Sequence, residues 1–60
     1  MHVTAITADN IYKLFRIERD RAGNFYVVDN RGPNAVLSDH FKSMAEAQRE
    51  WSRRVEQALN

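Results

Sequence analysis

The stretch "FKSMAEA", Phe41–Ala47, holds the junction on which the predicted fold depends. Phe41 is an aromatic residue of the kind enriched in strands, and it indicates the end of one. Ser43 is a favoured helix cap, because its hydroxyl can accept a hydrogen bond from a backbone N–H of the first turn. Glu46, three residues later, completes the sequence pattern of a capping box. The stretch therefore predicts a strand that passes directly into a helix.

A helix over residues 43–59 follows from the apolar pattern after this cap. Apolar side chains recur there every three or four residues and form one stripe, made of Met44, Ala47, Trp51, Val55 and Ala58. Charged and amide side chains occupy the opposite side of the helix. A helix of this kind buries its apolar stripe, so we expect Trp51, at the centre of the stripe, to lie in the core.

Three strands are predicted before the junction. The clearest is "FYVV", residues 25–28, and "AVLS", residues 35–38, is the next. Residues 11–18, "IYKLFRIE", are rich in β-branched and aromatic side chains and indicate a further strand. Their apolar spacing also fits a helical face, so strand and helix both remain open for this segment. The turn "RDRAGN" contains Gly23, which can adopt a positive φ.

These elements predict one α+β domain, a three-stranded antiparallel sheet packed on one C-terminal helix. Residues 1–10 are an N-terminal arm or a short edge strand, residues 11–42 form the sheet, and residues 43–59 form the helix. Since no linker or repeat divides the chain, we expect residues 1–60 to be a single small domain and a complete protein.

Composition limits what such a domain can do. A 60-residue chain buries only about 60% of its unfolded surface, so its core is small. The chain has no cysteine and no long apolar run, so we expect a cytoplasmic protein without disulfides, membrane span or secretion signal. Nine basic and eight acidic residues give a net charge of +1, which is low for a protein dedicated to duplex DNA.

The pattern Phe41-x-Ser43-x-x-Glu46-Ala47 resembles the joint between last strand and helix in the arm-binding domains of phage and transposon integrases and in plant AP2-type domains. Those domains lay a three-stranded sheet, backed by one helix, in the DNA major groove. The resemblance implies the same fold over residues 11–59 and sheet-mediated DNA binding. Phosphate contacts would then fall on Arg16, Arg19, Arg21 and Arg31, with Tyr12 or Tyr26 near the bases. The strand before the helix has no basic residue, so the fold carries over more readily than the DNA contacts.

Successive side chains of a strand point to opposite faces of the sheet, so each predicted strand divides into two sets. One set fits beneath the helix: Ile11, Phe15, Ile17, Phe25, Val27 and Leu37. The other set forms a second face that is largely apolar: Tyr12, Leu14, Arg16, Tyr26, Val28 and Val36. One helix cannot cover both faces of a sheet. Three candidates for covering the second face are residues 1–10, a second copy of the chain in a homodimer, and a protein partner.

The sequence holds few residues suited to catalysis or metal binding. His2 and His40 are the only histidines. Ser38, Asp39 and His40 are adjacent, so their side chains point in alternating directions and cannot assemble into a triad by themselves. Two histidines without cysteine are too few ligands for a metal site. We therefore expect no enzyme activity, no metal and no cofactor.

These observations predict a non-catalytic small binding protein. We expect it to be encoded by a phage or mobile element and to occupy a surface of a host protein or protein–nucleic acid complex, as anti-CRISPR inhibitors do. Tyrosine and arginine dominate binding hot spots, so the partner is expected on the second sheet face. Its predicted contacts there are Tyr12, Leu14, Arg16, Tyr26 and Val28. Direct DNA binding is the alternative.

Overall fold

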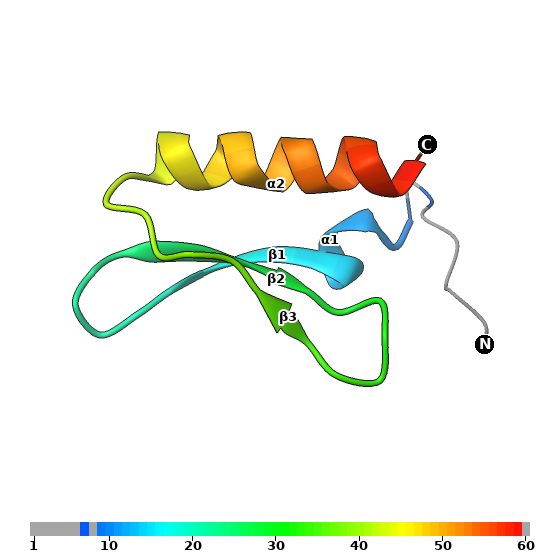
Figure 1. Cartoon of the computed structure of the whole chain (residues 1–60), viewed down its shortest axis with the longest axis horizontal. Helices are drawn as coiled ribbons and strands as arrows, with labels where there is room; N and C mark the ends of the chain where they lie inside the picture. The colour runs from blue at the N-terminus through cyan, green and yellow to red at the C-terminus, as the bar shows by residue number, and fades with distance from the viewer. Residues whose placement is uncertain (1–6, 8, 60) are drawn as a thin grey trace.

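The computed structural model describes Thr7 and residues 9–59. A three-stranded antiparallel sheet forms one layer and a C-terminal helix forms the other, as Figure 1 shows. The elements in chain order are α1 (Ile11–Leu14), β1 (Phe15–Arg19), β2 (Phe25–Asp29), β3 (Val36–Leu37) and α2 (Met44–Leu59). The predicted α+β class, with a three-stranded antiparallel sheet and a C-terminal helix, is confirmed.

The first strand begins later than the sequence suggested. Residues 11–14 form the helical turn α1, in which the backbone N–H groups of Ile11 and Leu14 each donate to a carbonyl four residues earlier at 3.0 Å. Ile11 and Leu14 lie three residues apart, so the turn brings both side chains to one side, where they pack with Val55 of α2. The predicted strand is therefore wrong for residues 11–14.

β1 and β2 form a hairpin and pair along their full length. In the connecting turn Gly23 has a φ of +88°, which glycine adopts without steric cost, as the sequence predicted. Asp20 fastens this turn, because its Oδ1 accepts a hydrogen bond from the Asn24 N–H at 2.9 Å. The sheet order is β1-β2-β3, so β1 and β3 are both edge strands.

The register of β3 reverses the predicted faces of Val36 and Leu37. Leu37 stands opposite Val28, and Val36 stands opposite Asp29. Cross-strand partners share a face, so Leu37 lies with Val28 on the face away from α2. Both Val36 and Leu37 are 55% exposed. The prediction that Leu37 packs beneath the helix while Val36 lies on the second face is wrong, because two adjacent apolar residues do not indicate which one points inward.

A bulge interrupts the pairing between β2 and the segment that leads to α2. The regular ladder ends at Ser38, and pairing resumes where Phe41 stands opposite Phe25. Residues 39–40 therefore both face Tyr26, which is the two-against-one arrangement of a β-bulge. Because of this extra residue, Phe41 enters the junction with α2 at the end of the sheet.

α2 follows the predicted cap at Ser43, whose Oγ accepts a hydrogen bond from the Glu46 N–H at 3.2 Å. Its apolar stripe packs inward through Ala47, Trp51, Val55 and Ala58. Met44, the first residue of the predicted stripe, is 43% exposed and does not join the core. In the part of the chain that the structure describes, neither helix is long and apolar enough to cross a membrane.

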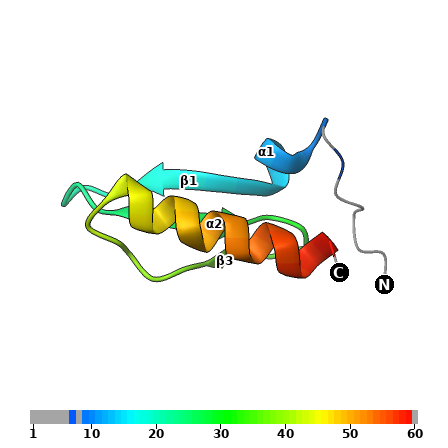
Figure 2. The same cartoon turned by 90° about the horizontal axis from the view of Figure 1, so that it is seen from above.

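α2 covers the sheet unevenly. In the view from above, β1 lies to one side of α2 over much of its length (Figure 2). Phe15, at the start of β1, is completely buried, whereas Ile17 in the middle of the strand is only partly buried. The offset leaves space between β1 and α2.

α2 carries a three-membered ion cluster, in which Arg53 is exposed and the Glu50 and Arg54 side chains are largely covered. The Glu50 carboxylate accepts hydrogen bonds from Arg53 at 2.7 Å and from Arg54 at 2.6 Å. The bond from Arg53, supported by that from Arg54, stabilises the charged carboxylate and lowers the pKa of Glu50 from 4.5 to about 2. Side chains three and four residues apart lie next to each other on a helix, which brings both arginines to Glu50.

We expect Ser38→Ala to lower the free energy of unfolding by about 1–3 kcal/mol, the usual effect of leaving a buried group unpaired. The Ser38 Oγ accepts a hydrogen bond from the Val27 N–H at 2.7 Å, and Val27 is completely buried. Urea unfolding followed by circular dichroism measures the change. Ser52→Ala, at an exposed serine of α2, is the control, and equal losses in the two variants would contradict this role of Ser38.

Glu50 should make stability depend on pH. Because the pKa of Glu50 is lowered in the folded chain, its contribution to the free energy of unfolding is complete above pH 4.5. That contribution is lost as the pH falls toward about 2. We expect the free energy of unfolding of the wild type to decline over that window more steeply than that of Glu50→Gln. Glu56→Gln, on the exposed side of the same helix, should behave as wild type. Parallel pH profiles for wild type and Glu50→Gln would refute the prediction.

Candidate functional site

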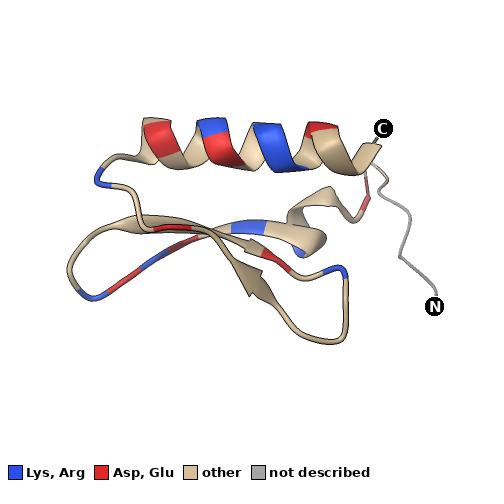
Figure 3. Cartoon of the chain, viewed as in Figure 1, with Lys and Arg blue, Asp and Glu red and all other residues tan. Residues whose placement is uncertain are grey.

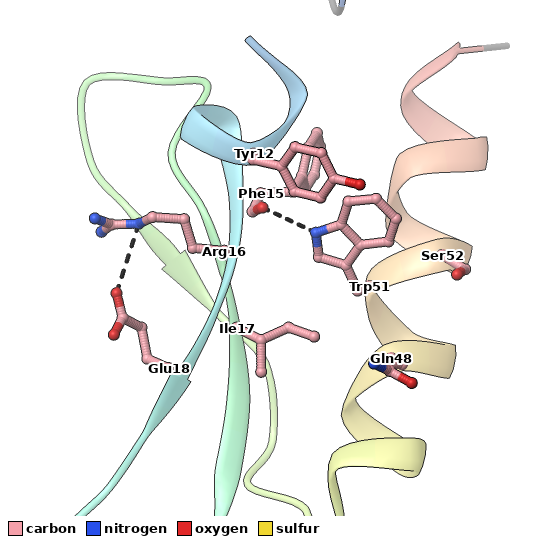
Figure 4. A pocket seen from close by; sticks show the side chains of 8 residues that line it. All are labelled: Tyr12, Phe15, Arg16, Ile17, Glu18, Gln48, Trp51 and Ser52. Carbon is pink, nitrogen blue, oxygen red and sulfur yellow. Dashed lines mark hydrogen bonds and ion pairs between the residues drawn. The ribbon is translucent and has the colours of Figure 1, made fainter. Parts of the chain in front are cut away.

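A groove with a volume of about 570 Å3 opens between β1 and α2 (Figure 4). The residues that line it come from α1, β1 and α2: Tyr12, Phe15, Arg16, Ile17, Glu18, Gln48, Trp51 and Ser52. Figure 4 shows Ile17 pointing toward α2, whereas Arg16 and Glu18 point away from it at the outer side of β1. Aromatic and aliphatic side chains therefore form the inside of the groove, and polar ones form its rim.

Two stacked aromatic rings form one end of the groove. The ring centroids of Tyr12 and Trp51 lie 5.6 Å apart, and the ring planes are 16° from parallel. The Trp51 Nε1–H donates to the Phe15 carbonyl at 2.8 Å, which fixes the indole against β1. Tyr12 is 74% exposed despite the stack, so most of its ring is open to a partner.

The helical turn α1 explains the position of Tyr12. Ile11 and Leu14 face the core, so Tyr12, one residue after Ile11, points out of it. The strand prediction missed the aromatic pair, because it placed Tyr12 on the far face of the sheet, whereas Trp51 packs against the core as expected. Trp51 is half-buried. The helical alternative for residues 11–18 contained the signal that would have brought the two rings together.

Arg16 and Glu18 form an ion pair at the rim of the groove. The Arg16 Nε lies 3.6 Å from the Glu18 Oε1, and the two side chains are 49% and 42% exposed. They stand two residues apart on β1 and share the face away from α2. An exposed pair of this kind contributes little to stability, so both charges can be used for contacts with another molecule.

The second face of the sheet is smaller than predicted. Its centre is Tyr26, whose ring stacks on His40 with centroids 4.5 Å apart. The His40 Nδ1 lies 2.6 Å from the Asp20 Oδ2. The hydrogen bond with His40, together with that from the Asn24 N–H, holds the pKa of Asp20 below its usual value. Beside this cluster Val28 is 5% exposed, so it offers little surface.

The structure separates residues that the sequence assigned to one partner-binding face. Arg16, Tyr26 and Val28 do share the second face. Leu14 is 9% exposed and belongs to the core, and Tyr12 belongs to the groove. Their predicted grouping with Tyr26 is wrong, because a helical turn and not a strand carries them. The idea that residues 1–10 cover the second face falls mostly outside the described residues.

Arg31 and Asp29 form a paired contact on the α2 side of the sheet. The Arg31 guanidinium donates to both carboxylate oxygens of Asp29, at 3.0 Å and 2.8 Å, and lies 5.1 Å from the centre of the Phe15 ring. Burial disfavours the charge on Asp29, but the hydrogen bonds from Arg31 outweigh it and lower the pKa of the carboxyl. This pair was not predicted from the sequence.

The predicted phosphate contacts do not gather on one surface. Arg16 lies on the second face, whereas Arg19 lies on the α2 side with its guanidinium 5.7 Å from the centre of the Phe25 ring. Arg31 is held by Asp29, and Arg21 is exposed in the β1–β2 turn. Figure 3 shows basic and acidic residues interspersed along α2 and around the sheet.

The candidate catalytic residues are engaged in structural contacts. The Ser38 hydroxyl donates to the Asp39 carbonyl at 2.8 Å and accepts from the Val27 N–H. His40 contacts Tyr26 and Asp20 at the edge of the second face. Among the described residues, no three histidine, cysteine or acidic side chains come together in a way that could hold a metal ion.

Comparison with known proteins adds no relative to this picture. No protein-family model, no curated protein and no solved structure matches the chain. The candidate site therefore stands on its own geometry: an aromatic groove with a charged rim at the edge of a small sheet.

Proposed function

We propose that this chain is a non-catalytic binding protein and that its contact surface is the groove between β1 and α2. The observation that carries the proposal is the exposed Tyr12 ring, stacked on Trp51 at the end of a groove of about 570 Å3. The partner we propose is a protein that inserts an apolar or aromatic side chain between this stack and Ile17.

The composition of the groove supports a protein partner. Interfaces are enriched in aromatic residues and arginine at their centre and are polar at their rim. Here Tyr12 and Trp51 supply the aromatic surface, and Ile17 supplies an aliphatic one. Gln48 and Ser52 on the α2 side can form hydrogen bonds at the rim. Both rings are held before a partner arrives, so little side-chain freedom is lost on binding.

The charge distribution favours a protein over a nucleic acid as the partner. Binding to phosphates requires several cations on one face. The arginines on the sheet lie on opposite sides of it, and Asp29 and Glu18 neutralise two of them. Arg53 and Arg54 of α2 are likewise bound to Glu50. The narrower expectation of a phage-type inhibitor that acts on a host protein stays a prediction.

A selection from a random peptide library tests the groove directly. We expect enrichment of peptides with aromatic or large aliphatic side chains, and we expect them to change the fluorescence of Trp51, the single tryptophan of the chain. Tyr12→Ala should weaken their binding at least about tenfold, because it removes an exposed hot-spot side chain. Thermal unfolding should remain close to wild type, since Tyr12 is 74% exposed.

Tyr26→Ala is the matched control, because it removes the same side chain from the other face of the sheet. Its peptide affinity should stay within about threefold of wild type, below the loss expected for a hot spot. Peptides that lose affinity for Tyr26→Ala and keep it for Tyr12→Ala would place the contact surface on the second face. Failure to enrich any peptide would contradict the groove as a protein-binding site.

Duplex DNA binding should be absent. We expect no complex in a fluorescence-anisotropy titration at about 50 mM salt, where phosphate contacts are strongest. Tight binding at that salt that disappears at about 200 mM would instead support the sheet-mediated DNA function implied by the integrase resemblance. In that case Arg21→Ala and Arg16→Ala would each reduce the salt dependence.

A further inference from the structure

β1 is an edge strand whose outward backbone groups follow from its pairing with β2. Just before the strand, the Asn30 N–H donates to the Leu14 carbonyl at 2.7 Å. Just after it, the Asp20 N–H donates to the Asn24 carbonyl at 2.8 Å. In an antiparallel pair, residues that bond to the neighbour alternate with residues whose N–H and C=O point outward. Even-numbered residues of β1 therefore bond to β2, and odd-numbered residues point their backbone groups outward.

Only part of this outer edge is occupied. The Phe15 N–H donates to the Ile11 carbonyl, and the Phe15 carbonyl accepts from Trp51. Within the described part of the chain, the backbone groups of Ile17 and Arg19 have no such partner. An edge with free N–H and C=O groups is a template for pairing with another strand. Figure 2 shows no described element lying outside β1 beyond its start.

We propose that a second copy of this chain occupies that edge, with the two β1 strands antiparallel around a two-fold axis at Ile17. The result is a continuous six-stranded sheet with both α2 helices on one side. This inference goes beyond the proposed function, because it uses the outer edge of β1 and not the inside of the groove.

Charge complementarity selects this register. In a two-fold pairing, the residue at the axis stands opposite itself. With Arg16, Glu18 or Arg19 at the axis, a charged residue would face its own copy, which is destabilising. With Ile17 at the axis, Arg16 of each copy stands opposite Glu18 of the other. Of the registers centred on residues 16–19, it alone opposes no like charges.

The charges of this register are compatible with the contacts already present, and so are its hydrogen bonds except at the Arg19 carbonyl, because the Phe15 N–H opposite it already donates to Ile11. Arg16 and Glu18 lie 3.6 Å apart within one copy, so two copies would form a closed square of alternating charge. Ile17 would exchange two backbone hydrogen bonds with its own copy. The Arg19 N–H would face the Phe15 carbonyl of the second copy, where one lone pair remains beside that used by Trp51.

A complementary pair of charge variants tests the register. Arg16→Glu has two acidic residues at the positions that pair, and Glu18→Arg has two basic ones. We expect each alone to self-associate at least about tenfold more weakly than wild type, measured as mass against concentration by analytical ultracentrifugation. Mixed together, the two variants should form a heterodimer, because every Glu then stands opposite an Arg.

The mixing experiment separates pairing from folding. A charge change that merely disturbed the fold would not be corrected by adding another disturbed variant. Arg49→Glu, which makes the same charge change on exposed α2 surface, should dimerise as wild type does. Tyr12→Ala should also dimerise, so failure of the groove as a binding site would leave this inference standing.

Two outcomes would overturn the inference. One is a folded wild-type chain that keeps the 7.0 kDa monomer mass up to millimolar concentration. The other is a dimer whose strength does not respond to the variants at Arg16 and Glu18, which would place the contact elsewhere. In the first case the open edge would be free for an extended segment of a different protein.

Discussion

The hydrogen bond from the Trp51 indole to the Phe15 carbonyl joins the two layers of this protein at the edge of the sheet. A half-buried indole N–H requires an acceptor, and this carbonyl is available because it points outward from an edge strand. The bond fixes the ring that supports Tyr12, and it occupies the edge of β1 at its first residue. Together with the bond from the Phe15 N–H to the Ile11 carbonyl, this contact occupies the backbone groups at the start of β1.

The size of the domain explains why a groove exists at all. The buried apolar residues of the described chain are only Leu14, Phe15, Val27, Val28, Ala47 and Val55. One helix cannot cover all three strands, and α2 lies so that β1 is left partly bare (Figure 2). Here the turn α1 covers only the start of β1, and aromatic rings close the end of the groove.

Sequence periodicity predicted the architecture well where one pattern was unambiguous. The cap at Ser43, the apolar stripe of α2 and the positive φ at Gly23 each depend on local chemistry, and each is present in the structure. The faces of Val36 and Leu37 could not be predicted in the same way. Their register depends on the bulge at residues 39–40, which is a property of pairing between distant segments and leaves no signal in the local sequence.

The candidate site was harder to predict than the fold, because it depends on a change of period within one short segment. Residues 11–14 follow a helical period, and the strand period begins only at Phe15. If residues 11–14 are assigned the strand period, Tyr12 is placed on the opposite face of the sheet and not in the groove. Where a helical turn meets a strand, the apolar period changes, so neither period alone predicts the direction of every side chain in a short segment. The change of period at Phe15 is the reason that the strand prediction is wrong. It also places Tyr12 beside Trp51 and leaves the Tyr12 ring exposed.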